Sequence, residues 1–245
     1  MSQQKVAFIT GANKGLGLET ARQLGKLGIA VVIGSRDLEK GVAAAQKLKS
    51  EGTTAEAIRF DVTNPADYQA VYDFLDKHYG RLDILVNNAG IARENFLGGN
   101  QTSTTSAEVL HDTFDTNFFG AIQVTQTLLP LLRKSPAGRI VNLSSILGSL
   151  TLHATPGSPI YDAKAFAYDA SKAALNSFTV HLAHELRDTK IKVNSAHPGW
   201  VKTDMGTDAA PMEIPDGAKT SVRLATLPAD GPTGGYFHMN DALPW

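Results

Sequence analysis

The chain has 245 residues and a formal net charge of −1, and 42% of its residues are hydrophobic. This length fits one α/β domain, and the balanced charge gives no general attraction to nucleic acid or anionic membranes. The absence of cysteine excludes thiol nucleophiles, disulfides and thiolate metal sites. No apolar run approaches the roughly 18 residues of a membrane span, and the first residues do not resemble a signal peptide. We therefore predict a cytoplasmic protein without membrane or nucleic-acid partners.

Short apolar runs alternate with segments of helical period along most of the chain. The predicted strands are Val6–Ile9, Ala30–Gly34, Ala55–Phe60, Leu82–Val86, Arg139–Leu143, Lys192–His197 and Gly235–Met239. The predicted helices are Leu16–Leu27, Leu38–Glu51, Pro65–Tyr79, Ala107–Lys134 with a bend or break near Gly120, Ala165–Asp188 and Gly217–Leu227. Two stretches rich in Gly, Pro, Thr and Asp, Ser149–Ile160 and Thr203–Asp216, are predicted to be loops around a site.

This order of elements predicts the fold class. Strands that are apolar on both faces and separated by helices indicate a parallel sheet covered by helices on both faces. Right-handed crossovers make this a doubly wound, Rossmann-type α/β fold. No linker or repeat divides the chain, so we predict one dinucleotide-binding and catalytic domain over residues 1–245.

A glycine-rich turn, Gly11-x-x-x-Gly15-x-Gly17, lies between the first predicted strand and the first predicted helix. Glycines let the backbone approach a pyrophosphate, and the helix N-terminus offers free N–H groups to it. The spacing departs from the common Gly-x-Gly-x-x-Gly, and such a turn can also serve packing alone. Its position after the first strand favours a dinucleotide site. The expected contacts are Gly11, Asn13, Lys14, Gly15, Leu16 and Gly17.

The end of the second predicted strand indicates which dinucleotide binds. An acidic residue at this position would bind the ribose hydroxyls of NAD, whereas here Ser35 is followed by Arg36, with Lys14 near the same pocket. Two cations around a small hydroxyl residue fit a 2′-phosphate, so we predict NADP(H), with a roughly ten- to a hundredfold preference. If the strand ended one residue later, Asp37 could bind a ribose and the cofactor would be NAD.

Tyr168 and Lys172 are four residues apart on a predicted helix, which is about one turn. An ammonium beside a phenol stabilises the phenolate and lowers a pKa that is about 10 when unperturbed. We therefore expect a tyrosine that exchanges a proton near neutral pH. Together with a dinucleotide, such a tyrosine indicates hydride transfer to or from a carbonyl group.

Further motifs occur in order along nearly the whole chain. They are Thr10-Gly11-x-x-x-Gly15-x-Gly17, Asp61-Val62, Asn87-Asn88-Ala89-Gly90, Asn117, Ser145, Tyr168-x-x-x-Lys172 and Pro198-Gly199. This ordered set resembles the short-chain dehydrogenase/reductase family. The C-terminal stretch with Gly234-Gly235-Tyr236-Phe237 and Pro244-Trp245, together with the basic pair, resembles the carbonyl reductase branch.

The resemblance implies the remaining cofactor contacts. Asp61 would bind the adenine amino group, with Val62 beside the ring, and the residues after Pro198-Gly199 would hold the nicotinamide carboxamide. The matched cofactor positions outside the glycine turn are Arg36, Asp61, Val62, Asn88, Ala89, Gly90, Tyr168, Lys172, Pro198, Gly199, Val201 and Thr203.

The resemblance also implies the catalytic residues. Ser145, rather than the adjacent Ser144, and Tyr168 would hydrogen-bond the carbonyl oxygen of the substrate. Lys172 would hold the nicotinamide ribose, and the backbone carbonyl of Asn117 would bind a water that leads to Lys172. The implied activity is NADPH-dependent reduction of ketones and aldehydes, including quinones, to alcohols, with Tyr168 as proton donor.

Two other kinds of function remain open from the sequence. The fold permits an NADP(H)-binding sensor or scaffold without turnover, and the scaffold also suits alcohol dehydrogenation with NAD, dehydration or epimerisation. No carboxylate–histidine cluster indicates a metal site. The side chains expected to line an apolar substrate pocket are Phe96, Leu97, Leu147, Leu152, Ile160, Tyr161, Trp200 and Met205.

The distance from Ser145 to Tyr168, 23 positions, departs from the family pattern. It is longer than in most members and shorter than in animal carbonyl reductases. The extra residues, around Leu152–Ile160, precede the helix that builds the oligomer interface in the family. We therefore expect a monomer or homodimer rather than a tetramer, and an additional wall of the substrate pocket.

Overall fold

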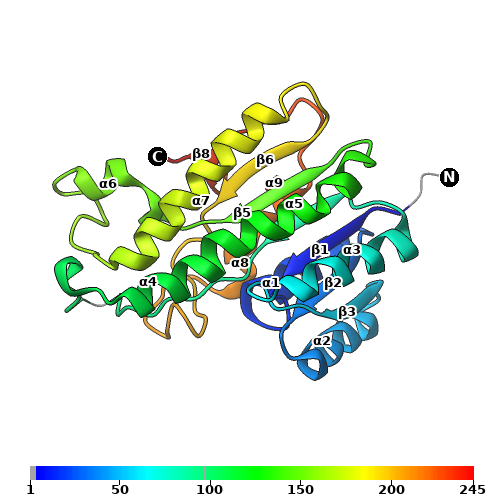
Figure 1. Cartoon of the computed structure of the whole chain (residues 1–245), viewed down its shortest axis with the longest axis horizontal. Coiled ribbons are helices and arrows are strands. Elements are labelled where there is room, and N and C mark those ends of the chain that lie inside the picture. Colours follow the sequence, from blue (N-terminus) through cyan, green and yellow to red (C-terminus); the bar gives the residue numbers. More distant parts are fainter. Residues whose placement is uncertain (1–3, 97) are drawn as a thin grey trace.

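A computed structural model describes residues 4–96 and 98–245, and a continuous sheet runs through its centre (Figure 1). The strand order is β3-β2-β1-β4-β5-β6-β7-β8. The strands are β1 (Val6–Thr10), β2 (Ala30–Ser35), β3 (Ala55–Arg59), β4 (Ile84–Asn87), β5 (Arg139–Leu143), β6 (Lys192–Ala196), β7 (Tyr236–His238) and β8 (Asp241–Ala242). Every neighbouring pair from β3 to β7 is parallel, which confirms the predicted parallel sheet. The antiparallel β7–β8 pair was not predicted.

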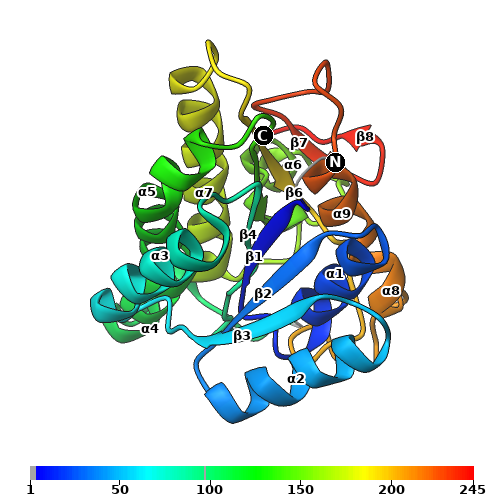
Figure 2. The ribbon, with the colours of Figure 1, turned by 90° about the vertical axis from the view of Figure 1, so that its right-hand side faces the viewer.

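Helices cover both faces of this sheet, as the alternation of the sequence predicts (Figure 2). Helices α3, α5 and α7 lie on one face, and α1, α2 and α9 on the other. The helices are α1 (Gly15–Lys26), α2 (Leu38–Ser50), α3 (Pro65–Tyr79), α4 (Ala107–Phe114), α5 (Gly120–Arg133), α6 (Leu150–Ala154), α7 (Phe166–Glu185), α8 (Ile214–Gly217) and α9 (Lys219–Ala225). Among the described residues, no helix is both long and apolar enough to cross a membrane.

The two faces of the sheet bury separate cores because successive side chains of a strand point to opposite sides. In β1, Phe8 packs into the core under α3, α5 and α7, whereas Ile9 packs into the core under α1, α2 and α9. Val32 and Ile33 of β2 divide in the same way. Central strands that are buried on both sides explain the continuous apolar runs in the sequence.

The predicted break near Gly120 is present and has an unusual geometry. Between α4 and α5 the chain forms a π-helical turn over Asp115–Phe119, and α5 starts at Gly120. A Cβ at Gly120 would lie 2.4 Å from the Cγ2 atom of Val62 and 2.5 Å from its carbonyl oxygen, so only glycine fits. Single π turns inside helices are frequent at functional sites.

The prediction of a continuous loop over Ser149–Ile160 is wrong, because this stretch contains α6. The helix is only five residues long, and contacts at its start stabilise it. The Ser149 hydroxyl accepts a hydrogen bond from the Leu152 N–H at 3.2 Å, and the Thr151 N–H donates to the carbonyl of Trp245 at 2.9 Å. Since Trp245 is remote in sequence, local pattern alone does not reveal this helix.

The helix predicted over Gly217–Leu227 starts earlier and is divided into two pieces, α8 and α9, with Ala218 between them. A Cβ at Gly217 would come within 2.5 Å of the Val201 Cγ2 atom, so α8 packs closely on this residue. The predicted loop over Thr203–Asp216 consequently loses its last residues to α8.

Candidate active site

The main cleft lies at the carboxyl ends of the central strands, on both sides of the point where the strand order reverses between β1 and β4. Open α/β sheets bind ligands at this switch point. The cleft has a volume of about 1280 Å³, which exceeds that of an ordinary small-molecule pocket and can hold a dinucleotide together with a substrate. The predicted site residues that line it are Gly11, Asn13, Lys14, Gly15, Leu16, Gly17, Arg36, Asp61, Val62, Asn88, Ala89, Gly90, Tyr168, Lys172, Pro198 and Thr203.

Four predicted residues do not line the cleft, for different reasons. Asn117 is 1% exposed and lies behind it, and Val201 is 4% exposed and packs on α8. Gly199 and Ser145 also lie outside the lining. An orienting role for Asn117, Gly199 and Val201 therefore has to act through the backbone or through a neighbouring side chain, whereas the Ser145 side chain hydrogen-bonds Tyr168, which lines the cleft.

The N-terminus of α1 faces the cleft and carries no capping side chain. Lys14 occupies the N-cap position without a side-chain hydrogen bond, whereas α2 and α3 are capped by Asp37 and Asn64. Gly11 and Gly15 have positive φ angles of 63° and 56°, a region that favours glycine. The free N–H groups of this turn fit the pyrophosphate of a dinucleotide.

The third glycine of the turn permits close packing. A Cβ on Gly17 would lie 2.5 Å from Asn88 Nδ2 and 2.8 Å from both the Ala12 Cα and the Gly11 carbonyl oxygen. Asn88 Nδ2 donates to the Thr10 carbonyl at 2.8 Å, so this packing ties the end of β1 to the end of β4. The helix therefore starts directly against the strand ends that form the floor of the cleft.

The end of β2 supports the prediction for the cofactor phosphate. The strand ends at Ser35, the expected strand-end position but one residue beyond the predicted range Ala30–Gly34, and Arg36 lines the cleft with no ion pair to another described residue. Asp37 caps α2, where its carboxylate accepts a hydrogen bond from the Lys40 N–H at 3.1 Å. Asp37 also lines the cleft, but its carboxylate is engaged by the helix start and by the Lys40 ammonium, so the competing ribose role of Asp37 is disfavoured.

Two lysines, Lys14 and Lys40, also contribute positive charge at this end of the cleft. Lys14 forms an exposed ion pair with Asp204 of the opposite loop, so its ammonium lies across the cleft. Lys40, which we did not predict as a site residue, also lines the cleft and pairs with Asp37 at 3.1 Å. The sequence could have indicated Lys40 as a site residue, because it lies three residues after the N-cap of α2 and this position faces back toward the end of β2.

Tyr168 and Lys172 lie on the buried side of α7, one turn apart and next to the cleft. The Lys172 Nζ atom is 5.6 Å from the centroid of the Tyr168 ring and donates to the Leu143 carbonyl at 2.7 Å. The Lys172 ammonium also lies beside Gly90 in the chain after β4, where a Cβ would be 3.5 Å from Lys172 Nζ. The spacing of four residues therefore predicted the shared helix face correctly.

The expected fall in the pKa of Tyr168 is not present in the protein alone. Burial raises the pKa of Tyr168 to about 12, and the interaction with the Ser145 side chain lowers it only in part. Burial also lowers the pKa of Lys172 to about 8. The spacing of four residues carried no information about burial, and burial opposes charge on both groups.

Ser145 and Ser144 point to different surroundings at the end of β5. Ser145 Oγ accepts a hydrogen bond from the Leu147 N–H at 3.2 Å and interacts with Tyr168, and its carbonyl accepts from the Tyr236 hydroxyl. Ser144 lines the cleft, but its buried hydroxyl has no hydrogen-bond partner among the described residues. Of the two serines, only Ser145 has a contact with Tyr168, and its catalytic role stays a prediction.

The π turn places Asn117 in a defined network. Its Oδ1 accepts from the Ile91 N–H at 2.8 Å, and its Nδ2 donates to the Ile91 carbonyl at 2.9 Å and to Ser171 Oγ at 3.1 Å. The side chain is therefore fully occupied in joining the chain after β4 to α7, and the backbone carbonyl remains the group of Asn117 to consider for a bound water.

The substrate end of the cleft is apolar and partly aromatic. Phe96, Trp200 and Met205 line it, and the Phe96 ring contacts Tyr168 edge-on, with centroids 4.9 Å apart. Leu97 lies outside the described residues.

The other predicted wall residues lie away from the cleft. They are Leu147, Leu152, Ile160 and Tyr161. Tyr161 is 38% exposed and its ring faces the Lys164 ammonium at 5.3 Å. The prediction that the extra residues form a pocket wall is therefore wrong; this segment packs behind Ser145 and the start of α7.

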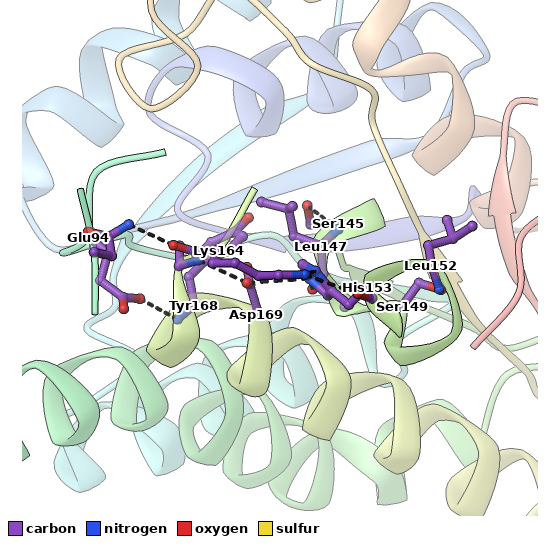
Figure 3. Close-up of polar contacts among 12 residues, drawn as sticks. Glu94, Ser145, Leu147, Ser149, Leu152, His153, Lys164, Tyr168 and Asp169 are labelled. Atoms are coloured by element: carbon purple, nitrogen blue, oxygen red, sulfur yellow. Dashed lines mark hydrogen bonds and ion pairs between the residues drawn. The ribbon is translucent and has the colours of Figure 1, made fainter. Parts of the chain in front are cut away.

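Two acidic residues near Tyr168 were not predicted from the sequence (Figure 3). Glu94 Oε2 accepts a hydrogen bond from the Tyr168 N–H at 2.9 Å, and Asp169 Oδ2 accepts from the Ala165 N–H at 3.0 Å. Burial raises the pKa of Asp169 to about 7, and Glu94 adds to this increase. The sequence did indicate that a cap must come from elsewhere, because Ala165 at the helix start has no polar side chain that could cap the helix.

Comparisons with known proteins agree with this geometry. The family model described as short chain dehydrogenase matches residues 5–214. NADPH carbonyl reductase 1 of Mus musculus is 36% identical over 287 residues, covering 100% of this chain and 99% of the mouse protein. The chain therefore belongs to the short-chain dehydrogenase family.

Solved structures show the same fold. Carbonyl reductase Sniffer of D. melanogaster matches with a TM-score of 0.84 and 29% identity, covering 99% of this chain and 100% of that one. The NADPH-bound carbonyl reductase from chicken fatty liver matches with a TM-score of 0.84 and 25% identity, covering 100% of both chains.

Proposed function

We propose that this protein reduces ketones and aldehydes to alcohols with NADPH, with Tyr168 as the proton donor. The protein is an NADP-dependent oxidoreductase of the carbonyl reductase branch, as its relatives indicate. The observation that carries the catalytic assignment is the cluster of Ser145 with the buried side chains of Tyr168 and Lys172, beside a cleft of dinucleotide size. A protein that only binds the dinucleotide would not require this cluster.

The residues at the cofactor end fit NADPH. The uncapped N-terminus of α1 suits the pyrophosphate, Arg36 and Lys14 suit the 2′-phosphate, and Asp61 suits the adenine amino group. Bound NADPH supplies a hydride to the carbonyl carbon. The chain's own task is to hold the carbonyl near the cofactor and to provide a proton.

Proton donation follows from the burial of the two titratable groups. With a pKa of about 12, Tyr168 is protonated at neutral pH and can donate to the developing alkoxide. Lys172, whose pKa burial lowers to about 8, also carries its proton at neutral pH and can replace the one that Tyr168 gives up. The Ser145 hydroxyl, connected to Tyr168, orients and stabilises the carbonyl oxygen.

The substrate class that fits the cleft is apolar and aromatic. Phe96 stands edge-on to Tyr168, and Trp200 and Met205 extend the apolar surface. A flat aryl ketone or quinone can stack on such rings. We propose this class ahead of small hydrophilic carbonyl compounds.

The test measures the oxidation of NADPH, and then of NADH, against aryl ketones, diketones and quinones. We expect turnover that requires the carbonyl compound and is faster with NADPH. The two adjacent serines provide a matched pair: Ser145→Ala should lower kcat about 10²- to 10³-fold, whereas Ser144→Ala should stay close to the wild type. Tight NADPH binding without turnover of any carbonyl would instead favour the non-catalytic sensor or scaffold.

We also propose that the protein is a monomer or homodimer and acts in the cytoplasm. The α6 segment precedes α7, and its Leu150 side chain is 67% exposed. The surface before α7 therefore carries extra residues that family members with the common Ser–Tyr spacing lack. Light scattering coupled to size-exclusion chromatography measures the mass directly, and a tetramer would contradict the proposal. The cytoplasmic location stays a prediction, which imaging of a tagged chain can check.

A further inference from the structure

The helix start that carries Tyr168 is capped by one residue from outside α7 and by one from its first turn. Ala165, at the N-cap position, offers no side-chain hydrogen bond. The two carboxylates of Glu94 and Asp169 take this role, through the N–H groups of Tyr168 and Ala165 (Figure 3). The position of Tyr168 therefore depends on residues that do not take part in the chemistry.

His153 of α6 links this helix start to the turn that follows Ser145. Its Nε2 atom lies 2.9 Å from the Leu147 carbonyl oxygen and 3.3 Å from Asp169 Oδ2 (Figure 3). Leu147 in turn donates its N–H to Ser145 Oγ at 3.2 Å. A continuous path of contacts therefore runs from Ser145 through Leu147 and His153 to Asp169, the neighbour of Tyr168 in the chain.

The surroundings of the ring fix its tautomer. Both neighbours of Nε2 are acceptors, so Nε2 carries the proton. The other ring nitrogen, Nδ1, lies 3.1 Å from Lys164 Nζ, an ammonium that can only donate, so Nδ1 carries the lone pair. Burial lowers the pKa of His153, and the Lys164 charge lowers it as well, in agreement with a neutral ring.

We infer that His153 is a positioning residue that holds the turn after Ser145 against the first turn of α7, and so sets the separation of the Ser145 and Tyr168 hydroxyls. This inference rests on the proposed function for its kinetic consequence. His153 touches neither hydroxyl and acts through Leu147 and Asp169. His153 lies in the segment where the Ser145–Tyr168 spacing departs from the family pattern. The extra residues therefore provide a contact that fixes the relative position of Ser145 and Tyr168.

The test compares two substitutions of His153. His153→Leu removes both ring nitrogens, whereas His153→Gln keeps an amide donor for Leu147 and an acceptor for Lys164. We expect His153→Leu to lower kcat roughly ten- to a hundredfold with an unchanged KM for NADPH, and His153→Gln to recover most of the loss. As the control, Ser158→Ala removes another hydrogen bond of the same segment, to the Leu152 carbonyl, and should leave kcat unchanged.

A second readout does not require turnover. In protein with isotope-labelled tyrosine, the signal of the Tyr168 ring carbon that bears the hydroxyl, assigned with Tyr168→Phe, should shift in His153→Leu and return in His153→Gln. The inference is overturned if this signal does not move, if His153→Leu keeps the wild-type kcat, or if Ser158→Ala loses as much activity. A shifted signal in a protein that reduces no carbonyl would support the positioning and contradict the proposed function.

Discussion

At the cofactor end of the cleft the predicted pyrophosphate contacts come from one contiguous turn, whereas at the proton-transfer end the contacts come from segments far apart in the sequence. The residues from Gly11 to Gly17 form the cofactor turn, and the nearby cations are exposed; the Lys14 side chain is 70% accessible. Such a site binds its ligand through backbone N–H groups and solvent-exposed charges. A substitution of one of the exposed cations there should therefore change cofactor affinity with little effect on the fold.

The proton-transfer end is buried and joins four separate parts of the chain. Tyr168 and Lys172 are 6% and 4% exposed; Lys172 meets the end of β5 and the chain after β4, and the neighbouring Ser171 meets the π turn. Burial opposes charge on both groups, which shifts their pKa values in opposite directions. Substitutions there should therefore change chemistry and stability together.

The largest expected effect is the loss of the Tyr168 hydroxyl. We expect Tyr168→Phe to lower kcat about 10²- to 10⁴-fold, because the positioned proton donor is lost, while NADPH affinity stays near that of the wild type. Single-turnover kinetics and a fluorescence titration with NADPH measure the two quantities. Tyr161→Phe is the matched control, since Tyr161 also has a lysine beside it but lies away from the cleft. Equal losses in both variants would contradict the assignment.

The second effect concerns the exposed cation at the cofactor end. Arg36→Ala should raise the KM for NADPH about ten- to a hundredfold and leave the KM for NADH unchanged, because a charge-assisted hydrogen bond to the 2′-phosphate is removed. Steady-state kinetics with both cofactors give the ratio. Arg133→Ala, on an exposed and distant helix end, is the control. A parallel change for NADPH and NADH would show that Arg36 does not recognise the phosphate.

The smallest effect is a change in how stability depends on pH. The pKa of Asp169 is about 7 in the folded protein, raised by burial from 3.8. Because the folded state favours the protonated carboxyl of Asp169, this group contributes its full stabilisation below about pH 4, and the contribution is lost as the pH rises through 7. Asp169→Asn mimics the protonated form, so its unfolding free energy relative to wild type should rise by about 1–2 kcal/mol from pH 4 to 8. Urea unfolding measures the difference.

The control for this prediction is Asp188→Asn, because the Asp188 side chain is 86% exposed. It should follow the wild type at every pH. A constant difference between Asp169→Asn and the wild type across this pH range would mean that folding does not raise the pKa of Asp169.

Sequence patterns predicted the parts of the molecule that depend on local order. The end of β2 at Ser35 and the helix face shared by Tyr168 and Lys172 were correct, because strand and helix periods fix them. The α6 helix was missed because Trp245 stabilises it from far along the chain. The fall in the Tyr168 pKa was wrongly predicted because residue spacing does not reveal desolvation.

The π turn over Asp115–Phe119 has a consequence for how this chain tolerates insertions and deletions. A regular α-helix advances about 100° per residue, and a π turn accommodates one residue more than an α-helical turn does. Deleting a single residue in this turn would let α4 and α5 join as one regular helix; because the turn already absorbs the extra residue, both helices would keep their orientation, while the side chains within the turn would be redirected. Asn117 would then lose Ile91 and Ser171 together. The π turn thus holds one residue more than an α-helical turn, and the network behind the cleft depends on that extra residue.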